Sequence, residues 1–362
     1  MKQGWEYKKF ESCINKTPKP KQVKTEEYNS GTKYPIVSQE DKLISGYYDD
    51  ESYVFHIDSP VVIFGDHTRV LKYIDFDFVV GADGVKIISP KQELDAKFLL
   101  YYLQWYKIPN LGYSRHYKLL KEINIPLPPK STQLAIVSEL DKINELIRLK
   151  KEQLKDFDNL AQSIFYEMFG DPVENEKGWE VKTLDEVCSA KNGLVDPKEE
   201  PYASMYHVGP ANILSDTGEL INLKLAKDEN LISGKYLFNT GMILYSKIRP
   251  NLNKVTKATF EGICSADMYP LIPKDNIVSE YLLFILKTKK FLDYAISNSG
   301  RANIPKINRE ALMTYKTILP PLPLQHLFAH RIEQIEHQKA EVQKAITDLE
   351  TLLASRMQYW FE

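Results

Sequence analysis

The sequence has little cysteine and no long apolar run. Only three cysteines, Cys13, Cys188 and Cys264, occur in 362 residues, which argues against a disulfide framework and against a cysteine-type zinc site. The longest apolar or aromatic runs, such as FLLYYL at 98–103, are too short to span a bilayer. The first residues contain no apolar stretch typical of a secretion signal. These absences predict a globular protein of the reducing cytoplasm with no membrane span.

Motifs that would indicate catalysis are also missing. No stretch fits the phosphate-binding P-loop pattern, and SGKY at 233–236 does not complete it. No cluster of carboxylates and lysine typical of a nuclease stands out. Adenine methyltransferases carry an Asn/Asp/Ser-Pro-Pro-Tyr/Phe motif, whereas both Pro-Pro pairs here follow a leucine, Leu127 or Leu319. We therefore expect no catalytic residues and no cofactor in this chain.

The most informative feature that is present is an internal duplication. Four phrases occur twice in the same order: GWEYKKFESC and GWEVKTLDEVC (from Gly4 and Gly178), GADGVKIISP and CSADMYPLIP (from Gly81 and Cys264), AKFLLYYLQ and SEYLLFILK (from Ala96 and Ser279), and LPPKSTQ and LPPLPLQ (from Leu127 and Leu319). The offset between copies changes only from 174 residues (4 to 178) to 192 (127 to 319). Four matches in one order indicate a tandem repeat.

After each Leu-Pro-Pro the pattern changes from β-rich to helical. Proline is tolerated only in the first turn of a helix, so Pro-Pro marks where a helix can begin. Spacings of four and three then alternate, which predicts two helices of about 35–40 residues with a/d seams. The seam positions are Ile136, Leu140, Ile143, Ile147, Lys150, Leu154, Phe157, Ala161, Ile164 and Met168 in the first helix, and Phe328, Ile332, Ile335, Lys339, Val342, Ile346, Leu349, Leu353, Arg356 and Trp360 in the second.

These patterns predict a mixed α/β (α+β) fold of two tandem globular domains, each followed by a long helix. The expected divisions are 1–126 and 171–318 for the domains, and 127–170 and 319–362 for the helices. The helices are expected to pair as an antiparallel coiled coil with pseudo-twofold symmetry. Three charged residues interrupt the seams, and they either fix the register or snorkel to its edge.

Two polar groups could suggest a metal site, but each is interpreted as a surface. The first group is Asp75, Asp77 and Asp83; its first two members alternate in the strand-like YIDFDFVV, which is typical of a polar strand face. The second group lies on one face of the second helix, outside the seam, and comprises His326, His330, Glu333 and His337. A solvated or partner-facing helix surface explains them better than zinc does. No metal site is predicted.

The whole pattern resembles the DNA-specificity (S) subunit of type I restriction–modification systems. VVIFGDHTR (61–69), MFGDPVENEKGW (168–179), SGRANIPKINREAL (299–312) and LPPLPLQ (319–325) are similar to phrases of that family. The resemblance implies two target-recognition domains, each reading one half of a bipartite asymmetric DNA site. The helices would set the spacer and dock two methyltransferase subunits, directing adenine methylation and restriction.

The resemblance also implies what this chain leaves to its partners. S-adenosylmethionine, ATP and Mg²⁺ would be bound by the methyltransferase and restriction subunits. Two alternatives remain open. The chain could be the specificity chain of another multisubunit restriction system, or a coiled-coil interaction protein that does not bind DNA.

A net charge of −2 is unusual for a nucleic-acid binder, so basic residues must be local. The segments 245–260 and 299–309 contain no acidic residue. Arginine and lysine contact phosphates or guanine, and asparagine pairs with adenine. Residues alike in both repeats, such as Trp5 and Trp179, are expected to serve the architecture. The candidate DNA contacts are His67, Arg69, Lys72, Arg115, His116 and Lys118 in the first repeat, and Lys247, Arg249, Asn251, Asn253, Lys254, Arg301, Asn303 and Lys306 in the second.

Overall fold

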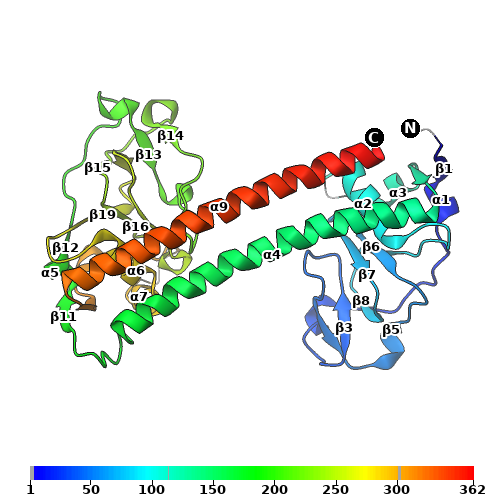
Figure 1. The fold of residues 1–362 in the computed structure, drawn as a ribbon, viewed down its shortest axis with the longest axis horizontal. Helices are drawn as coiled ribbons and strands as arrows, with labels where there is room; N and C mark the ends of the chain where they lie inside the picture. Colours follow the sequence, from blue (N-terminus) through cyan, green and yellow to red (C-terminus); the bar gives the residue numbers. More distant parts are fainter. Residues whose placement is uncertain (1–3, 113, 301–302) are drawn as a thin grey trace. The chain divides into compact units, whose positions relative to one another are not determined.

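The computed structural model describes residues 4–112, 114–300 and 303–362 (Figure 1). Internal contacts divide the chain into two compact units. Unit 1 comprises Met1–Gln153 with Val342–Glu362, and unit 2 comprises Leu154–Glu341. The two predicted long helices are present as α4 (Lys130–Phe169) and α9 (Leu322–Phe361), and each contributes one part to each unit. The predicted boundaries at 126, 170 and 318 follow the repeats along the sequence and stay a prediction.

The described residues of unit 1 contain two larger β-sheets, a two-stranded pair, and a helix that packs on one of the larger sheets. Its elements before α4 are β1 (Glu6–Lys9), α1 (Phe10–Cys13), β2 (Gln22–Val23), β3 (Tyr34–Val37), β4 (Gly46–Tyr48), β5 (Val54–Phe55), β6 (Val61–Gly65), β7 (Leu71–Ile74), β8 (Phe78–Gly81), β9 (Val85–Ile88), α2 (Ala96–Tyr106), α3 (Tyr117–Leu120) and β10 (Asn124–Leu127). One sheet has the order β7-β6-β9, and α2 packs against β6 and β7. The other has the order β2-β8-β3-β4, with β5 also on β8.

Unit 2 repeats this plan with different details. Its elements between the long helices are β11 (Glu180–Thr183), α5 (Leu184–Val187), β12 (Cys188–Ala190), β13 (Tyr206–Val208), β14 (Lys224–Leu225), β15 (Tyr236–Phe238), β16 (Ile243–Ser246), the 3₁₀ turn η6 (Pro250–Leu252), β17 (Val255–Lys257), β18 (Gly262–Cys264), β19 (Met268–Pro273), α6 (Ser279–Lys287), α7 (Lys289–Ser297), α8 (Arg309–Met313) and β20 (Lys316–Leu319). Its sheets have the orders β12-β19-β16-β17 and β14-β13-β18-β15. In both units the first and last strands of the repeat pair antiparallel, β1 with β10 and β11 with β20.

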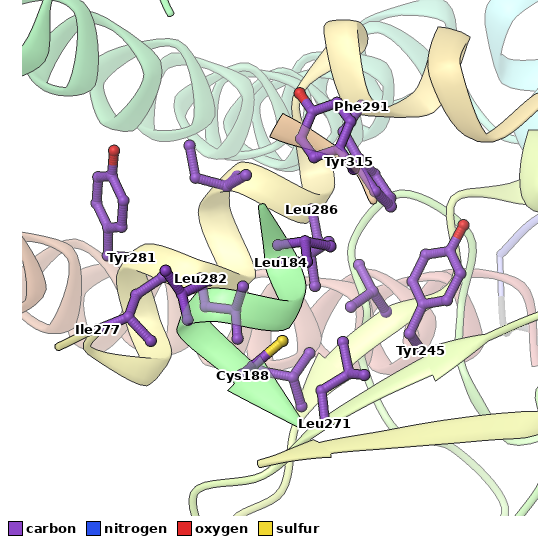
Figure 2. Close-up of a cluster of buried hydrophobic side chains, with 14 of the residues drawn as sticks. Leu184, Cys188, Tyr245, Leu271, Ile277, Tyr281, Leu282, Leu286, Phe291 and Tyr315 are labelled. Atoms are coloured by element: carbon purple, nitrogen blue, oxygen red, sulfur yellow. The ribbon is translucent and has the colours of Figure 1, made fainter. Parts of the chain in front are cut away.

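The core of unit 2 forms between α6 and its first sheet (Figure 2). Tyr281, Leu282 and Leu286 recur on one face of α6 and are fully buried, as the helical period requires. Across from Leu282 and Leu286 lie Tyr245 on β16 and Leu271 on β19, also buried, whereas the Tyr281 ring packs against the aromatic rings of the long helices. Each such side chain stabilises the fold by about 1.5–3 kcal/mol relative to exposure. The core therefore anchors the strand that carries the candidate hairpin loop described below.

In unit 1 the first part of α4 packs antiparallel on the last part of α9. The Arg356 guanidinium forms an ion pair with Glu139, and the Trp360 indole donates to the Glu139 carboxylate (3.0 Å). Lys151 pairs with Glu350 at 2.8 Å. The sequence numbers of the partners run in opposite directions, so the predicted antiparallel pairing is confirmed in this unit.

In unit 2 the last part of α4 packs antiparallel on the first part of α9. The rings of Phe165 and Phe169 lie 5.8 and 5.4 Å from that of Phe328, measured between centroids. The Lys339 ammonium reaches Asp158 across the seam at 2.9 Å. Lys339 and Arg356 thus bridge the helices and help to fix the register, whereas Lys150 bonds Gln153 on its own helix.

The end of each long helix completes the core of one unit. The Phe361 ring packs between those of Phe98 and Tyr102, at 5.5 Å from each. Phe169 is buried in the core of unit 2, and its carbonyl accepts from the Trp179 indole (2.8 Å). Trp179 has the architectural role expected of it.

The first Leu-Pro-Pro phrase forms a joint built on one buried glutamine. Gln133 is 1% exposed. Its Oε1 accepts from the N–H of Asp95 (2.8 Å), the N-cap residue of α2, and its Nε2 donates to the carbonyls of Glu93 and Pro128 (2.9 Å each). Three hydrogen bonds from one side chain therefore tie the start of α4 to the start of α2.

The second phrase forms the same joint in unit 2. Gln325 is 0% exposed. Its Oε1 accepts from the N–H of Val278 (2.9 Å), the N-cap residue of α6, and its Nε2 donates to the carbonyls of Asn276 (3.2 Å) and Pro320 (2.7 Å). The repeated motif is therefore a repeated hydrogen-bonding device that joins each domain to its helix.

Replacing Gln325 by leucine should destabilise unit 2 strongly. The substitution removes the partner of the half-buried Val278 N–H and of two carbonyls, at about 1–3 kcal/mol for each unmet group. Urea unfolding should show a loss of at least about 2 kcal/mol. Gln338→Leu, at an exposed position of α9, is the matched control. A Gln325→Leu variant as stable as the control would contradict this account.

The Glu139–Arg356 pair should give a pH-dependent contribution to stability. Hydrogen bonding from Arg356, with help from Trp360, holds the pKa of Glu139 below its ordinary value. A lowered pKa stabilises the fold above the unfolded value of about 4.3, and this contribution is lost as pH falls through the folded value. Both side chains are about one-third exposed, so we expect roughly 1 kcal/mol or less. The stability difference between wild type and Glu139→Gln should shrink between about pH 7 and pH 3. Glu341→Gln, at an exposed position, should show no such trend.

Candidate nucleic-acid interface

Each unit presents a hairpin loop at the same place in its repeat. In unit 1 the Gly65 N–H donates to the Val70 carbonyl (2.9 Å) and closes a loop of four residues, 66–69. In unit 2 the Ser246 N–H donates to the Lys254 carbonyl (3.0 Å) and closes a loop of seven residues, 247–253. The two loops are closed by the same kind of backbone hydrogen bond but differ in length.

Each hairpin loop is bonded to the segment that precedes a short helix. The His116 N–H donates to the Asp66 carbonyl (2.9 Å), just before α3. At the matching place before α8, the Ile307 N–H donates to the Lys247 carbonyl (3.0 Å). Two basic segments distant in sequence therefore meet in each unit. In unit 2 they are the two acid-free segments singled out in the sequence.

Asp66 and His116 are buried beneath the candidate surface of unit 1, and their hydrogen bonds hold its two segments together. Asp66 is 2% exposed, and its Oδ1 accepts from the Tyr117 N–H (2.7 Å). His116 is 0% exposed; its Nε2 accepts from the Leu111 N–H (3.0 Å), so its Nδ1 donates to the Asp66 carbonyl (2.9 Å). Both ring nitrogens of His116 are therefore used within the domain, and this ring has no surface that could reach DNA.

Lys72 is also buried, and its ammonium is bonded within the domain. It is 5% exposed, and its ammonium donates to the carbonyls of Ser38 (2.9 Å) and Lys42 (2.5 Å). Burial lowers its pKa. The expectation of DNA contact at Lys72 and His116 did not allow for this burial. Sequence counting treats every basic residue as if its charged end were exposed.

The other candidates of unit 1 reach the surface to different degrees. Arg115 and Lys118 are exposed, beside the start of α3. His67 and Arg69 are half-buried. Arg69 has a left-handed backbone (φ +62°) and donates to the Ile108 carbonyl (3.2 Å), which supports the segment leading to Arg115.

The hairpin loop of unit 2 is held in a strained conformation. Arg249 and Asn253, on either side of η6, have φ of +48° and +46°. This left-handed region is unfavourable for most residues other than glycine. The Arg249 N–H donates to the Pro305 carbonyl (2.7 Å), and the Asn253 amide nitrogen lies 3.4 Å from Asp216 Oδ1. These bonds hold a turn on which Arg249 and Asn251 are exposed.

Lys247 in this loop and Lys254 directly after it bind backbone carbonyls of the same unit. Lys254 donates to the Pro210 carbonyl (2.7 Å), and Lys247 donates to the Ala266 carbonyl (2.5 Å). Asn253 is 8% exposed. Asn303 and Lys306, in contrast, are exposed, and Arg301 lies outside the described residues.

The sequence analysis did not identify two residues that support the candidate surface, Asp66 and Asn192. Asp66 directly follows a fully buried strand, which is the pattern of a carboxylate at the edge of a core. Asn192 Oδ1 accepts from Arg309, 117 positions away, and only its place after a strand, beside a glycine, could have pointed to it. In the described part of the chain, no group of three or more His, Cys, Asp or Glu side chains is arranged to hold a metal ion. No helix among the described residues has the length and apolar character needed to cross a membrane.

The fold and its loops define a tandem recognition scaffold, in which two copies of one domain present equivalent loops of different sequence. A family model described as the type I restriction modification DNA specificity domain matches residues 2–156 and 176–351. The chain belongs to this family.

Similar curated proteins are specificity subunits of type I restriction enzymes. The EcoDI subunit of Escherichia coli is 36% identical over 170 residues, which cover 47% of this chain and 37% of that protein. The MjaIX subunit of Methanocaldococcus jannaschii is 23% identical over 257 residues, covering 64% and 58%. The EcoR124I/EcoR124II subunit of E. coli is 22% identical over 339 residues, covering 87% and 82%. The chain thus spans less than two thirds of the first two relatives.

Two solved structures share the fold. The type I restriction–modification S subunit from M. genitalium superposes with a TM-score of 0.61 at 16% identity, covering 99% of this chain and 96% of that one. A chain from a structure of type I restriction–modification complex assembly gives 0.57 at 18% identity, covering 100% and 98%. The similarity extends over the whole chain.

Removing the Asp66 carboxylate should loosen the segment that carries Arg115. Asp66→Ala leaves the N–H of the half-buried Tyr117 without its acceptor, and a hydrogen bond to a charged group is worth about 1.5–3 kcal/mol. Local opening, and with it trypsin cleavage after Arg115, should rise by about 10-fold or more. Asp75→Ala, an exposed carboxylate of the same unit, should leave cleavage unchanged. Equal rates for both variants would show that Asp66 does not hold this segment.

Proposed function

We propose that this chain is the non-catalytic DNA-recognition subunit of a type I restriction–modification enzyme. Each globular domain binds one half of a bipartite, asymmetric double-stranded DNA site. The observation that carries the proposal is the matched pair of family domains whose equivalent loops differ in length and composition. Two half-sites of different sequence require such a pair of readers, as in DNA binders that use two linked modules.

The surface residues divide into base-reading and backbone-binding candidates. Arg249, Asn251 and Asn303 are exposed in unit 2 and belong to the types that pair with guanine and adenine edges. Arg301, also an arginine of this segment, remains a candidate. Lys306, and Arg115 with Lys118 in unit 1, provide charges for phosphates or guanine, and His67 and Arg69 lie beside them. The bonds made by Lys247, Asn253 and Lys254 favour a positioning role for these three residues.

The long helices would set the spacer between half-sites and dock two methyltransferase subunits. Exposed leucines on the α4 part of unit 1 support docking: Leu134, Leu146 and Leu149 are 50%, 48% and 46% exposed. They lie outside the a/d seam, so the helix pair does not use them. Restriction subunits would join the same assembly. S-adenosylmethionine, ATP and Mg²⁺ would be bound by these partners, which supply the methylation of adenine and the cleavage.

The direct test is selection from a randomised double-stranded DNA library, with the full chain alone and with its methyltransferase partner. A bipartite motif with a fixed gap is expected, and the same motif should mark the methylated adenines of the source genome. Enrichment of no motif, or methylation by the chain alone, would refute the proposed function.

Arg249→Ala should relax the choice of base at one position of one half-site. Loss of a bidentate arginine contact costs roughly 1–3 kcal/mol of discrimination, and other positions should be unaffected. Binding of single-base-substituted sites at several salt concentrations measures this. Lys306→Ala should instead weaken all sites alike and reduce the salt dependence, if that lysine contacts a phosphate. Unchanged discrimination in Arg249→Ala would exclude the turn as a reader.

Leu146→Lys with Leu149→Lys should prevent methyltransferase binding without unfolding the chain. Burying two added charges in an apolar interface is strongly unfavourable. Co-purification should fall to background, while unfolding by urea stays near wild type because both positions are exposed. Asp156→Lys makes the same change in net charge at another exposed position of α4. Full methyltransferase binding by the double variant would place the docking surface elsewhere.

A further inference from the structure

A third segment of unit 2 lies beside the two candidate segments. It comprises residues 191–194, which follow β12, and the Lys191 N–H donates to the Pro270 carbonyl on β19 (2.8 Å). The adjacent Tyr269 contacts both of the others. Its ring lies 5.6 Å from the Lys247 ammonium, and its hydroxyl is 3.5 Å from the Ile307 carbonyl. The third segment is therefore part of the same surface region.

Arg309, the first residue of α8, fixes the orientation of Asn192 in this segment. Its Nη2 donates to the Ala190 carbonyl (2.6 Å), and its Nη1 donates to Asn192 Oδ1. An arginine has only donors, so the Asn192 atom that faces it must be the amide oxygen. The amide nitrogen of Asn192 therefore points away from Arg309. Asn192 is exposed, and no partner of this nitrogen occurs within the described residues.

The described residues of the first domain show no such arrangement. The residue that begins α3, where Arg309 begins α8, is Tyr117. Its ring packs on those of Phe10 and Phe64, at 6.1 and 6.3 Å. A core contact in one repeat is thus replaced by a guanidinium–amide pair in the other. Matched positions that differ in this way are candidates for residues that distinguish two half-sites of different sequence.

We propose that Asn192 reads an adenine in the half-site of the second domain, and that Arg309 is the positioning residue that orients its amide. This proposal rests on the proposed DNA-recognition function. The two N–H groups of Asn192 are available for adenine N7. Its oxygen accepts one bond from Arg309 and keeps a second lone pair for the adenine N6–H. Because Arg309 fixes which end of the amide faces outward, the amide need not be ordered on binding, which favours affinity.

A purely structural role for Asn192 makes a different prediction, and Asn192→Asp separates the two. Aspartate still accepts from Arg309, so the segment should keep its shape and thermal stability. It has no N–H to donate to adenine N7. Selection from a randomised double-stranded DNA library with the full chain should therefore give the wild-type motif with one adenine position flattened, by roughly 5- to 150-fold in preference.

Arg309→Lys provides the second variant. Lysine keeps the positive charge but lacks the fork that contacts Ala190 and Asn192 together. It should weaken preference at the same position as Asn192→Asp, with the salt dependence of binding unchanged, and the double variant should add little further loss. Asn230→Asp adds the same charge at an exposed asparagine outside the three segments and serves as the control.

The outcomes separate this inference from the function on which it rests. If the wild type enriches a bipartite motif and both variants enrich it unchanged, Asn192 and Arg309 do not read DNA and the inference is overturned. An equal loss at every position in Asn192→Asp and Asn230→Asp would also overturn it, because charge repulsion alone would then explain the effect. If the wild type enriches no motif, the proposed function itself fails.

Discussion

The buried glutamine at each Leu-Pro-Pro joint is the constraint on which the rest of the structure depends. Burying a side-chain amide is costly unless its N–H groups and its oxygen form hydrogen bonds. Gln133 and Gln325 each form three, all with backbone groups, and the two sets have the same arrangement. The direction in which a long helix leaves its domain is thereby set by hydrogen bonds and not by apolar packing alone. Helices that set the spacing between two half-sites need such a rigid joint to each domain.

The helices do more than connect the repeats, because their ends are core residues. Phe361 belongs to the second repeat by sequence but packs among the aromatic side chains of unit 1, and Phe169 ends the first helix inside the core of unit 2. Neither repeat therefore completes its own core. Stability, and the shape of the surfaces that would bind DNA, are consequently shared properties of the duplicated chain.

The sequence predicted those features that depend on periodicity, and it failed where contacts are distant. Heptad spacing identified the helices α4 and α9 and their seams, because a seam is a local pattern. The antiparallel orientation, expected because two similar helices of one chain can pair in this way, is confirmed. Arg249 and Asn251 are exposed on a turn, and their contact with DNA stays a prediction. Lys72 and His116 are buried, which the count of basic residues could not show. The Arg309–Asn192 pair joins positions 117 apart and has no local signature. The repeated glutamine was visible as a motif, but its hydrogen-bond partners were not.

The unequal hairpin loops suggest how such a protein can diversify. Each hairpin is closed by a backbone bond that does not involve the loop's side chains, between Gly65 and Val70 in one repeat and between Ser246 and Lys254 in the other. Extending a flexible loop from four residues to seven adds only about 0.5 kcal/mol of closure entropy, less than most single core substitutions. The backbone closure can therefore accept loops of different length and sequence at little cost. A new loop must still replace the bonds by which Asp66 and Arg69 hold the segments beside them, so the loop and its supporting segments are expected to change together.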